Sequence, residues 1–167
     1  MGVLIFGHHF YEGEFNNNRK HGLGFEKFPS KSEYSGYYVN GKPEGRGKYL
    51  WPNGEYYDGE WINGNKHGLG TWVGSKEDRY VGNWKNGKPD GEGVHEWING
   101  DRYEGSFKES LKHGYGVENF SNGDCYKGNY KNGKPEGEGE YFWKNGSYFH
   151  GTFMNGLRFG FGEFKNS

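Results

Sequence analysis

The 167-residue sequence has few residues of several types, and each shortage narrows the class of protein. It contains one cysteine, Cys125, which cannot form an internal disulfide and so favours a reducing compartment. Its apolar run at residues 3–6 is too short for a signal peptide or a membrane span. The formal net charge is only −1, with acids and bases interspersed. This balance argues against a nucleic-acid partner and against strong attraction to an acidic membrane, and we expect a cytoplasmic protein.

Aliphatic residues are also scarce, because hydrophobic residues make up 31% of the chain and aromatic residues alone account for 20%. Disordered chains are depleted in aromatic residues, so this composition indicates a folded protein. Glycine, at 33 residues, is nearly three times as frequent as in an average protein. We therefore expect a core built mainly of aromatic rings that lie against glycine backbone.

Aromatic residues recur every 23 residues without an insertion. They stand at Tyr11, Tyr34, Tyr57, Tyr80, Tyr103, Tyr126 and Phe149. A glycine follows each of them by two residues, and another aromatic residue follows that glycine by two more. Repeat positions 12 and 14 are glycine in every copy. The period defines seven repeats, at 11–33, 34–56, 57–79, 80–102, 103–125, 126–148 and 149–167, preceded at residues 1–10 by the N-terminal strand of a partial earlier copy.

Each repeat has the pattern of a β-hairpin. The motif Tyr-x-Gly-x-Trp alternates with period two, which is typical of a strand. An Asn-Gly pair follows in five copies, as at Asn40-Gly41, and favours a tight turn because both residues tolerate positive φ. We predict an all-β fold, an elongated single-layer antiparallel β-meander of successive hairpins that is open at its ends. We expect the irregular turns at 29–33 and 74–79 to differ locally from the others.

A second rhythm groups the repeats in pairs of 46 residues. Lys-Pro precedes the glycine pair in even copies, whereas Lys-His precedes it in odd copies. Repeat position 18 is tryptophan only in even copies, at Trp51, Trp97 and Trp143. Position 13 is apolar only in odd copies, at Leu23, Leu69, Tyr115 and Phe161. By strand parity, the position-13 side chains point away from the aromatic face and form separate apolar spots that a partner of matching spacing can contact.

The segment from Tyr57 to Gly70 resembles the membrane occupation and recognition nexus (MORN) repeat at every fixed place of the pattern Tyr-x-Gly-x-Trp-x-x-Gly-x-x-His-Gly-x-Gly. The resemblance extends over residues 11–167, with Asn18 and Ser110 replacing a glycine at position 8. It implies the hairpin array, but it does not specify one activity, because these repeats occur in junctophilins, phosphatidylinositol phosphate kinases, a lysine methyltransferase, radial-spoke proteins and parasite scaffolds. For localisation, it implies the cytoskeleton, cilia or the periphery of a membrane.

Motifs that resemble catalytic chemistry are explained by the repeat. Residues 36–42 fit Gly-x4-Gly-Lys, but Pro43 stands where a phosphate-binding loop needs Ser or Thr, and a strand follows instead of a helix. The histidines His21, His67 and His113 are 46 residues apart, too far apart in a hairpin array to bind one metal ion. We expect no enzymatic activity, no cofactor and no metal.

The preferred interpretation is a non-catalytic scaffold or adaptor that binds another protein, as a peptide or a helix, along an aromatic-lined groove. The groove residues are expected to be Trp51, Trp72, Trp97, Trp143, Tyr38 and Tyr130. The position-18 tryptophans are assigned equally to packing and to partner contact.

Two further interactions stay open at this point. The apolar C-terminal strand predicts self-association into a homodimer through Phe159, Phe161 and Phe164. The alternative function is a module that binds phospholipid, in particular phosphoinositide, weakly through Lys42, Lys88 and Lys134. Another alternative is an accessory region of a larger enzyme. The array would then be part of a longer protein.

Overall fold

The computed structural model describes all 167 residues, and its regular elements are fifteen β-strands. The chain divides into two compact units, Met1–Lys88 and Pro89–Ser167. In the first unit lie β1 (Gly2–Phe6), β2 (His9–Asn16), β3 (Arg19–Lys27), β4 (Glu33–Val39), β5 (Lys42–Leu50), β6 (Tyr56–Ile62), β7 (Asn65–Val73) and β8 (Arg79–Lys85). The second contains nearly all of β9 (Lys88–Glu96) and then β10 (Arg102–Lys108), β11 (Leu111–Asn119), β12 (Cys125–Lys131), β13 (Lys134–Phe142), β14 (Tyr148–Met154) and β15 (Leu157–Lys165).

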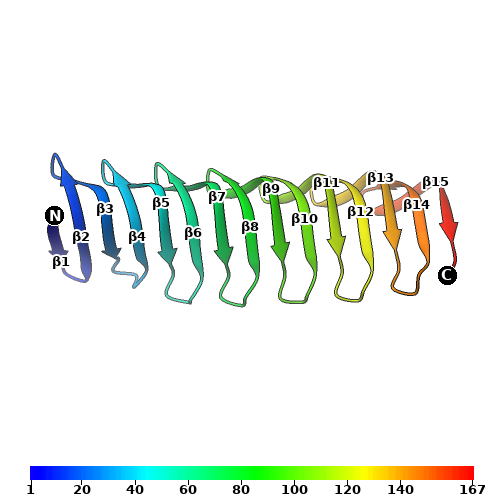
Figure 1. The fold of residues 1–167 in the computed structure, drawn as a ribbon, viewed down its shortest axis with the longest axis horizontal. Helices are drawn as coiled ribbons and strands as arrows, with labels where there is room; N and C mark the ends of the chain where they lie inside the picture. The colour runs from blue at the N-terminus through cyan, green and yellow to red at the C-terminus, as the bar shows by residue number, and fades with distance from the viewer. The chain divides into compact units, whose positions relative to one another are not determined.

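Within each unit, every strand pairs antiparallel with the strand that follows it in the sequence (Figure 1). No helix covers either face, so each unit is a single layer of strands. This confirms the predicted all-β, single-layer antiparallel meander. None of the structure is a helix long and apolar enough to cross a membrane.

The Asn-Gly pairs form the tight turns that their sequence predicts. Asn40 and Gly41 both have positive φ, at 50° and 85°, and the other four pairs repeat these values within a few degrees. Asn18 and Ser110, which stand in place of a glycine, also adopt positive φ, at 57° and 73°. The turn between β2 and β3 and the turn between β10 and β11 thus keep the shape of the others despite the missing glycine.

The expectation that the turns at 29–33 and 74–79 differ from the rest was wrong. In both, the backbone makes the same two hydrogen bonds as in the regular turns, for example Phe28 N to Ser32 O and Lys31 N to Phe28 O. Lys31 and Glu77 take φ values of 70° and 71°, in the places that Gly54 and Gly100 occupy in other turns. The pairing of the flanking strands sets the turn geometry, and a left-handed non-glycine residue costs only about 1–2 kcal/mol.

The core of each unit is the row of tyrosines at repeat position 1. Tyr11, Tyr34, Tyr57, Tyr80, Tyr103 and Tyr126 are at most 1% exposed. Each ring lies across two glycines on neighbouring strands, so that a Cβ placed on Gly24 would lie 2.5 Å from Tyr11 Oη. Each hydroxyl donates a hydrogen bond of 2.9 to 3.1 Å to the backbone carbonyl three residues later. Glycine therefore provides the space for the ring, and the backbone provides the partner for its hydroxyl.

The rings at repeat position 5 join these tyrosines into a ladder. Within each unit, neighbouring position-1 and position-5 rings pack edge-to-face, with centroids 5.0 to 5.6 Å apart and planes at 77° to 89°. Such a pair contributes about 0.5–1.5 kcal/mol beyond its burial. Trp61 also donates its indole hydrogen to Gly47 O at 2.9 Å. The ladder replaces the second layer that a sheet normally packs against.

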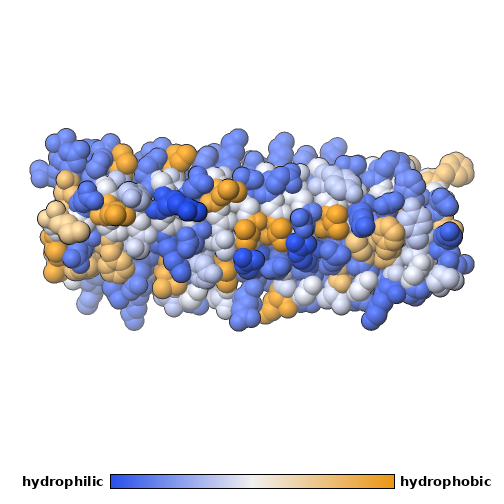
Figure 2. All heavy atoms as spheres, viewed as in Figure 1, coloured by the Kyte–Doolittle hydropathy of each residue, from blue (hydrophilic) through white to orange (hydrophobic).

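Side chains that alternate with the core rings along the strands are often polar and exposed, as at Glu12, Glu14 and Asp58. On the face seen in Figure 2, hydrophilic side chains predominate, and hydrophobic ones form small separate groups. The position-13 residues are exposed, as strand parity predicts, from 50% for Leu23 to 102% for Phe161.

Two glycines of β13 allow the steric cost of a Gly→Ala substitution to be measured separately from its backbone conformational cost. A Cβ at Gly139 would lie 2.4 Å from Tyr126 Oη, whereas nothing lies within 4 Å of one at Gly137, whose φ is +79°. We expect Gly139→Ala to lower the free energy of unfolding by about 2–3 kcal/mol, because the buried ring cannot move away. Gly137→Ala, the matched control, should lower it by about 1 kcal/mol. Urea denaturation measures both, and equal losses would contradict the role given to the tyrosine.

Candidate functional site

The aromatic face is incompletely covered at repeat position 18, where the tryptophans of even copies lie. Trp51 directly follows β5, and its backbone N–H donates to Glu55 O in the turn that leads to β6. Its ring packs against Tyr49 of the same strand end, with centroids 4.5 Å apart. Trp143 repeats this arrangement after β13, 4.8 Å from Tyr141. Each indole is half-buried and presents the rest of its surface to solvent.

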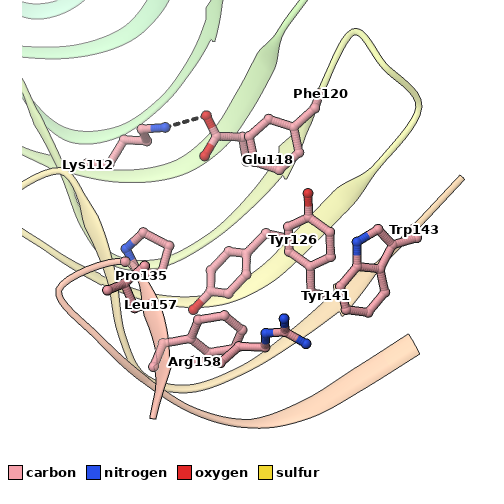
Figure 3. Close-up of a pocket in the computed structure, with 11 residues that line it drawn as sticks. Lys112, Glu118, Phe120, Tyr126, Pro135, Tyr141, Trp143, Leu157 and Arg158 are labelled. Carbon is pink, nitrogen blue, oxygen red and sulfur yellow. Dashed lines mark hydrogen bonds and ion pairs between the residues drawn. The ribbon is translucent and has the colours of Figure 1, made fainter. Parts of the chain in front are cut away.

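In the second unit, Tyr141 and Trp143 line an open pocket of about 470 Å³. Its walls are aromatic or apolar side chains from β12 to β15 and from the turns that follow β11 and β13. Figure 3 shows Tyr126, Tyr141 and Trp143 beside one another. Pro135 and Leu157 close one side, and the charged groups are Lys112, Glu118 and Arg158. An apolar pocket with a few polar groups at its rim is typical of a ligand-binding site.

The first unit has the same cluster of rings 92 residues earlier. Phe28 and Tyr49 have centroids 5.7 Å apart, as Phe120 and Tyr141 do at 6.0 Å. A cation lies above each tryptophan at the same distance: Lys66 Nζ is 5.5 Å from the Trp51 ring, and the Arg158 guanidinium is 5.5 Å from the Trp143 ring. Each unit thus carries one copy of the cluster.

A buried carboxylate stands beside each copy. Glu26 is 3% exposed and forms an ion pair with Lys20, accepts a hydrogen bond of 2.6 Å from Tyr38 Oη, and lies 2.5 Å from His9 Nε2. Glu118 is 7% exposed and is bound in the same way by Lys112 and by Tyr130 Oη at 2.7 Å. These glutamates occupy repeat position 16, where even copies have Tyr or His.

The surroundings of Glu26 set the direction of its pKa. Burial by itself would raise the pKa, but the hydrogen bonds from Lys20, Tyr38 and His9 outweigh it and hold the pKa of Glu26 below its usual 4.5. The carboxylate is therefore charged at neutral pH. It fixes Lys20 and Tyr38 and belongs to the framework beside the pocket.

The structure places the predicted groove residues in two different environments. Trp51, Trp72, Trp97 and Trp143 are half-buried, and Trp72 donates its indole hydrogen to Glu55 Oε1 at 2.7 Å. Tyr38 and Tyr130 belong to the core ladder, at 1% and 3% exposed, so they have almost no surface to offer a partner.

The lysines proposed for headgroup contact are exposed, and the register places Lys42 on the face opposite the aromatic rings. Lys42, Lys88 and Lys134 are exposed at repeat position 9. Lys42 pairs with Val39 and the next residue, Pro43, pairs with the core residue Tyr38, so Lys42 points to the opposite face. Headgroup binding by this exposed row stays a prediction.

The C-terminal strand is exposed along its length. Phe159, Phe161 and Phe164 are 54%, 102% and 52% exposed. Self-association through these residues stays a prediction.

Other candidate chemistry finds no support in the geometry. No group of three or more His, Cys, Asp or Glu is placed to hold a metal ion. Burial raises the pKa of the Cys125 thiol, which is the opposite of what a nucleophilic cysteine needs.

Sequence reasoning missed the buried glutamates and the cations above the tryptophans. The available signal was the alternation at repeat position 10, which is Lys or Arg in odd copies (Lys20, Lys66, Lys112, Arg158) and Pro in even copies (Pro43, Pro89, Pro135). Position 10 pairs across the turn with the core ring at position 5, so its side chain lies on the aromatic face.

Comparison with known proteins identifies the family. The MORN repeat model matches residues 11–33, 34–56, 57–79, 80–102, 103–125, 126–148 and 149–166, and the chain belongs to this family. No curated protein matches the chain.

Two solved structures match parts of the chain. One is the SAS-4 (dCPAP) TCP domain of Drosophila melanogaster in complex with a proline-rich motif of Ana2 (dSTIL), at 14% identity and a TM-score of 0.50, covering 78% of this chain and 72% of that one. The other is the TCP10 domain of Danio rerio CPAP in complex with a peptide of STIL, at 11% identity and a TM-score of 0.29, covering 89% and 86%. At this identity, the first likeness concerns the fold alone, and the second carries no argument.

The Glu26 cluster predicts a specific response to acid. Because the folded state holds the pKa of Glu26 below 4.5, its contribution to stability is present at neutral pH and is lost as the pH falls through the folded-state value. Glu26→Gln should lower the free energy of unfolding at pH 7, and its difference from the wild type should shrink as the pH falls below about 4.5. Urea titrations across this range measure it.

Glu12→Gln is the matched control, since Glu12 is an exposed carboxylate on β2. Its curve should run parallel to that of the wild type. A constant difference between Glu26→Gln and the wild type from pH 7 to pH 3 would show that Glu26 is not held charged.

Proposed function

We propose that this protein is a non-catalytic scaffold that binds an extended, proline-containing segment of another protein on its aromatic face. The observation that carries the proposal is the pocket of the second unit, in which Trp143, Tyr141 and Phe120 leave apolar surface open beside polar groups. The same ring cluster recurs around Trp51 in the first unit.

The chemistry of the site favours proline as the inserted residue. Proline-rich segments adopt the polyproline II conformation before binding and dock into grooves lined by aromatic rings. Such a segment loses little conformational entropy, so flat ring surfaces suffice to hold it. The half-buried indoles supply these surfaces, and an indole N–H can donate to the carbonyls of such a ligand where it is not already engaged.

The Drosophila TCP domain gives this proposal a precedent. It has a similar fold and its structure contains a proline-rich motif of its partner. The low identity transfers no residue from that complex to this chain, so the residues we propose here come from the exposure and packing of the tryptophans themselves. A role in a cytoskeletal assembly is a further proposal, which rests on the MORN repeats and not on this structure.

Substitution of the cluster tryptophans tests the proposal. Because each unit carries one copy of the cluster, the test removes both tryptophans. We expect Trp51→Ala/Trp143→Ala to weaken binding of a proline-rich peptide of about ten residues by tenfold or more, because a central Trp often contributes at least about 2 kcal/mol to an interface. Isothermal titration calorimetry on the full chain measures the affinity.

Leu69→Ala is the control, since Leu69 is 59% exposed on the opposite face and should leave the affinity unchanged. If the peptide binds equally well to both variants and to the wild type, the aromatic face is not the binding surface. If the wild type binds no proline-rich peptide, the proposed function is wrong.

A further inference from the structure

Four cations lie on the aromatic face at repeat position 10, and each stands above aromatic rings. Lys20 lies above Tyr11 and Tyr38, and Lys112 lies above Trp97, Tyr103 and Tyr130. Lys66 lies 4.5 Å from the Trp84 ring centroid as well as above Trp51, and Arg158 lies 5.3 Å from that of Phe149 as well as above Trp143. All four occupy the same repeat position, but Lys20, Lys66 and Lys112 are half-buried, whereas Arg158 is exposed on the last strand, β15.

Two of these cations are neutralised within the protein and two are not. Lys20 and Lys112 form ion pairs with Glu26 and Glu118, six residues further along the same strand. In the copies of Lys66 and Arg158, the residue six positions on is Trp72 or Phe164, which has no charge. Each unit therefore contains one paired and one unpaired cation.

The contacts of Lys66 confirm that it lacks an anion. Its Nζ makes no hydrogen bond, and no carboxylate oxygen lies within the 4.0 Å of an ion pair. The neighbouring acid is Glu55, whose Oε1 accepts the indole hydrogen of Trp72 instead. Burial lowers the pKa of Lys66, and the field of Glu55 only partly offsets this. A half-buried ammonium without a counter-charge is costly, and a bound anion would relieve the cost.

Arg158, which is exposed on β15, also lacks an anionic partner in the second unit. Figure 3 shows its guanidinium between the rings of the pocket and facing Trp143, while the ion pair of Lys112 and Glu118 stands apart from it. Arg158 makes no ion pair or hydrogen bond, although its planar group can bind a carboxylate with two parallel bonds.

We propose that Lys66 and Arg158 are anion subsites, each of which binds a carboxylate of the partner segment beside the tryptophan that binds its apolar residue. This inference rests on the proposed function, and it defines the ligand further. Each unit selects an extended segment in which an acidic side chain or a terminal carboxylate stands next to proline or another apolar residue.

The placement of the charges favours a peptide over a membrane surface. Each subsite adjoins an indole, so one ligand must supply a carboxylate and an apolar group side by side, as a short peptide does. Of the exposed lysines expected to meet lipid headgroups, Lys42 and Lys134 point to the opposite face. A flat membrane cannot contact both sets of cations at once.

Two synthetic peptides of about ten residues test the inference, one of alternating Pro and Glu and the other of alternating Pro and Gln. We expect the acidic peptide to bind the full chain about tenfold more tightly at low salt, and added salt to reduce this preference, since charged pairs near a surface are screened. Isothermal titration calorimetry measures both affinities.

The double variant Lys66→Gln/Arg158→Gln should bind both peptides with the affinity that the wild type has for the neutral one. The matched control is Lys42→Gln/Lys134→Gln, which removes two exposed charges from the opposite face and should keep the tenfold preference. Thermal unfolding of each variant checks that the sheet is intact. Trp72→Glu is a second route, because it places a carboxylate where Glu26 stands relative to Lys20 and should also reduce the preference.

The outcomes separate this inference from the proposed function. Equal binding of the two peptides to the wild type overturns the anion subsites and leaves the proline-binding surface in place. Binding of neither peptide overturns both. A preference that survives in Lys66→Gln/Arg158→Gln places the anion elsewhere and also overturns the inference. Vesicles of phosphatidylcholine with phosphatidylinositol 4-phosphate form the last arm, and their capture by the wild type but not by this double variant, without a peptide preference, would assign the subsites to lipid phosphate.

Discussion

The contact between a tyrosine ring and a pair of glycines on adjacent strands is the constraint on which the structure depends. A single-layer sheet has no second layer to bury its side chains, so each ring lies flat on the sheet itself. It can do so only where two neighbouring strands lack a Cβ, as Gly13 and Gly24 do under Tyr11. The buried hydroxyl then needs a partner, and the carbonyl of Glu14 lies within reach because the strand pairing is irregular at this point.

The same packing of rings against one face explains why the candidate binding residues lie on that face. The edge-to-face ladder uses repeat positions 1 and 5, and positions 10, 16 and 18 lie around it with part of their surface open. In the odd copies, the residue at position 16 determines whether the cation at position 10 has an internal ion-pair partner. With Glu26 or Glu118 there, the neighbouring lysine is held in an internal ion pair, and with Trp72 or Phe164 the cation stays available. In the odd copies, the residue at position 16 thus separates an internal ion pair from a cation that, in our proposal, binds an anion.

Much of the fold follows from local sequence. The spacing of Tyr11 and Gly13 sets the strands, and Asn40-Gly41 sets the turn, because few residues accept those backbone angles. The turns at Lys31 and Glu77 could not be predicted in this way, since strand pairing on both sides overrides the local preference. The site was harder to predict. Trp51 and Trp143 can be singled out because only even copies have Trp at position 18. Tyr38 and Tyr130 are also aromatic, but they are buried in the core, and their residue type does not reveal this. Lys42 is at repeat position 9 and Lys66 is at position 10, so their side chains point to opposite faces. The similar motifs Lys-Pro and Lys-His hide this shift of one residue.

Pairing only between sequence neighbours has a consequence for how such a protein changes over generations. No strand within either unit relies on a distant segment, so a tandem duplication or deletion of one repeat pair preserves every remaining hydrogen-bonded ladder. Slipped replication can therefore lengthen or shorten the array without requiring new contacts between the remaining repeats. The number of repeats can therefore change in whole steps, while the packing within each remaining repeat stays the same.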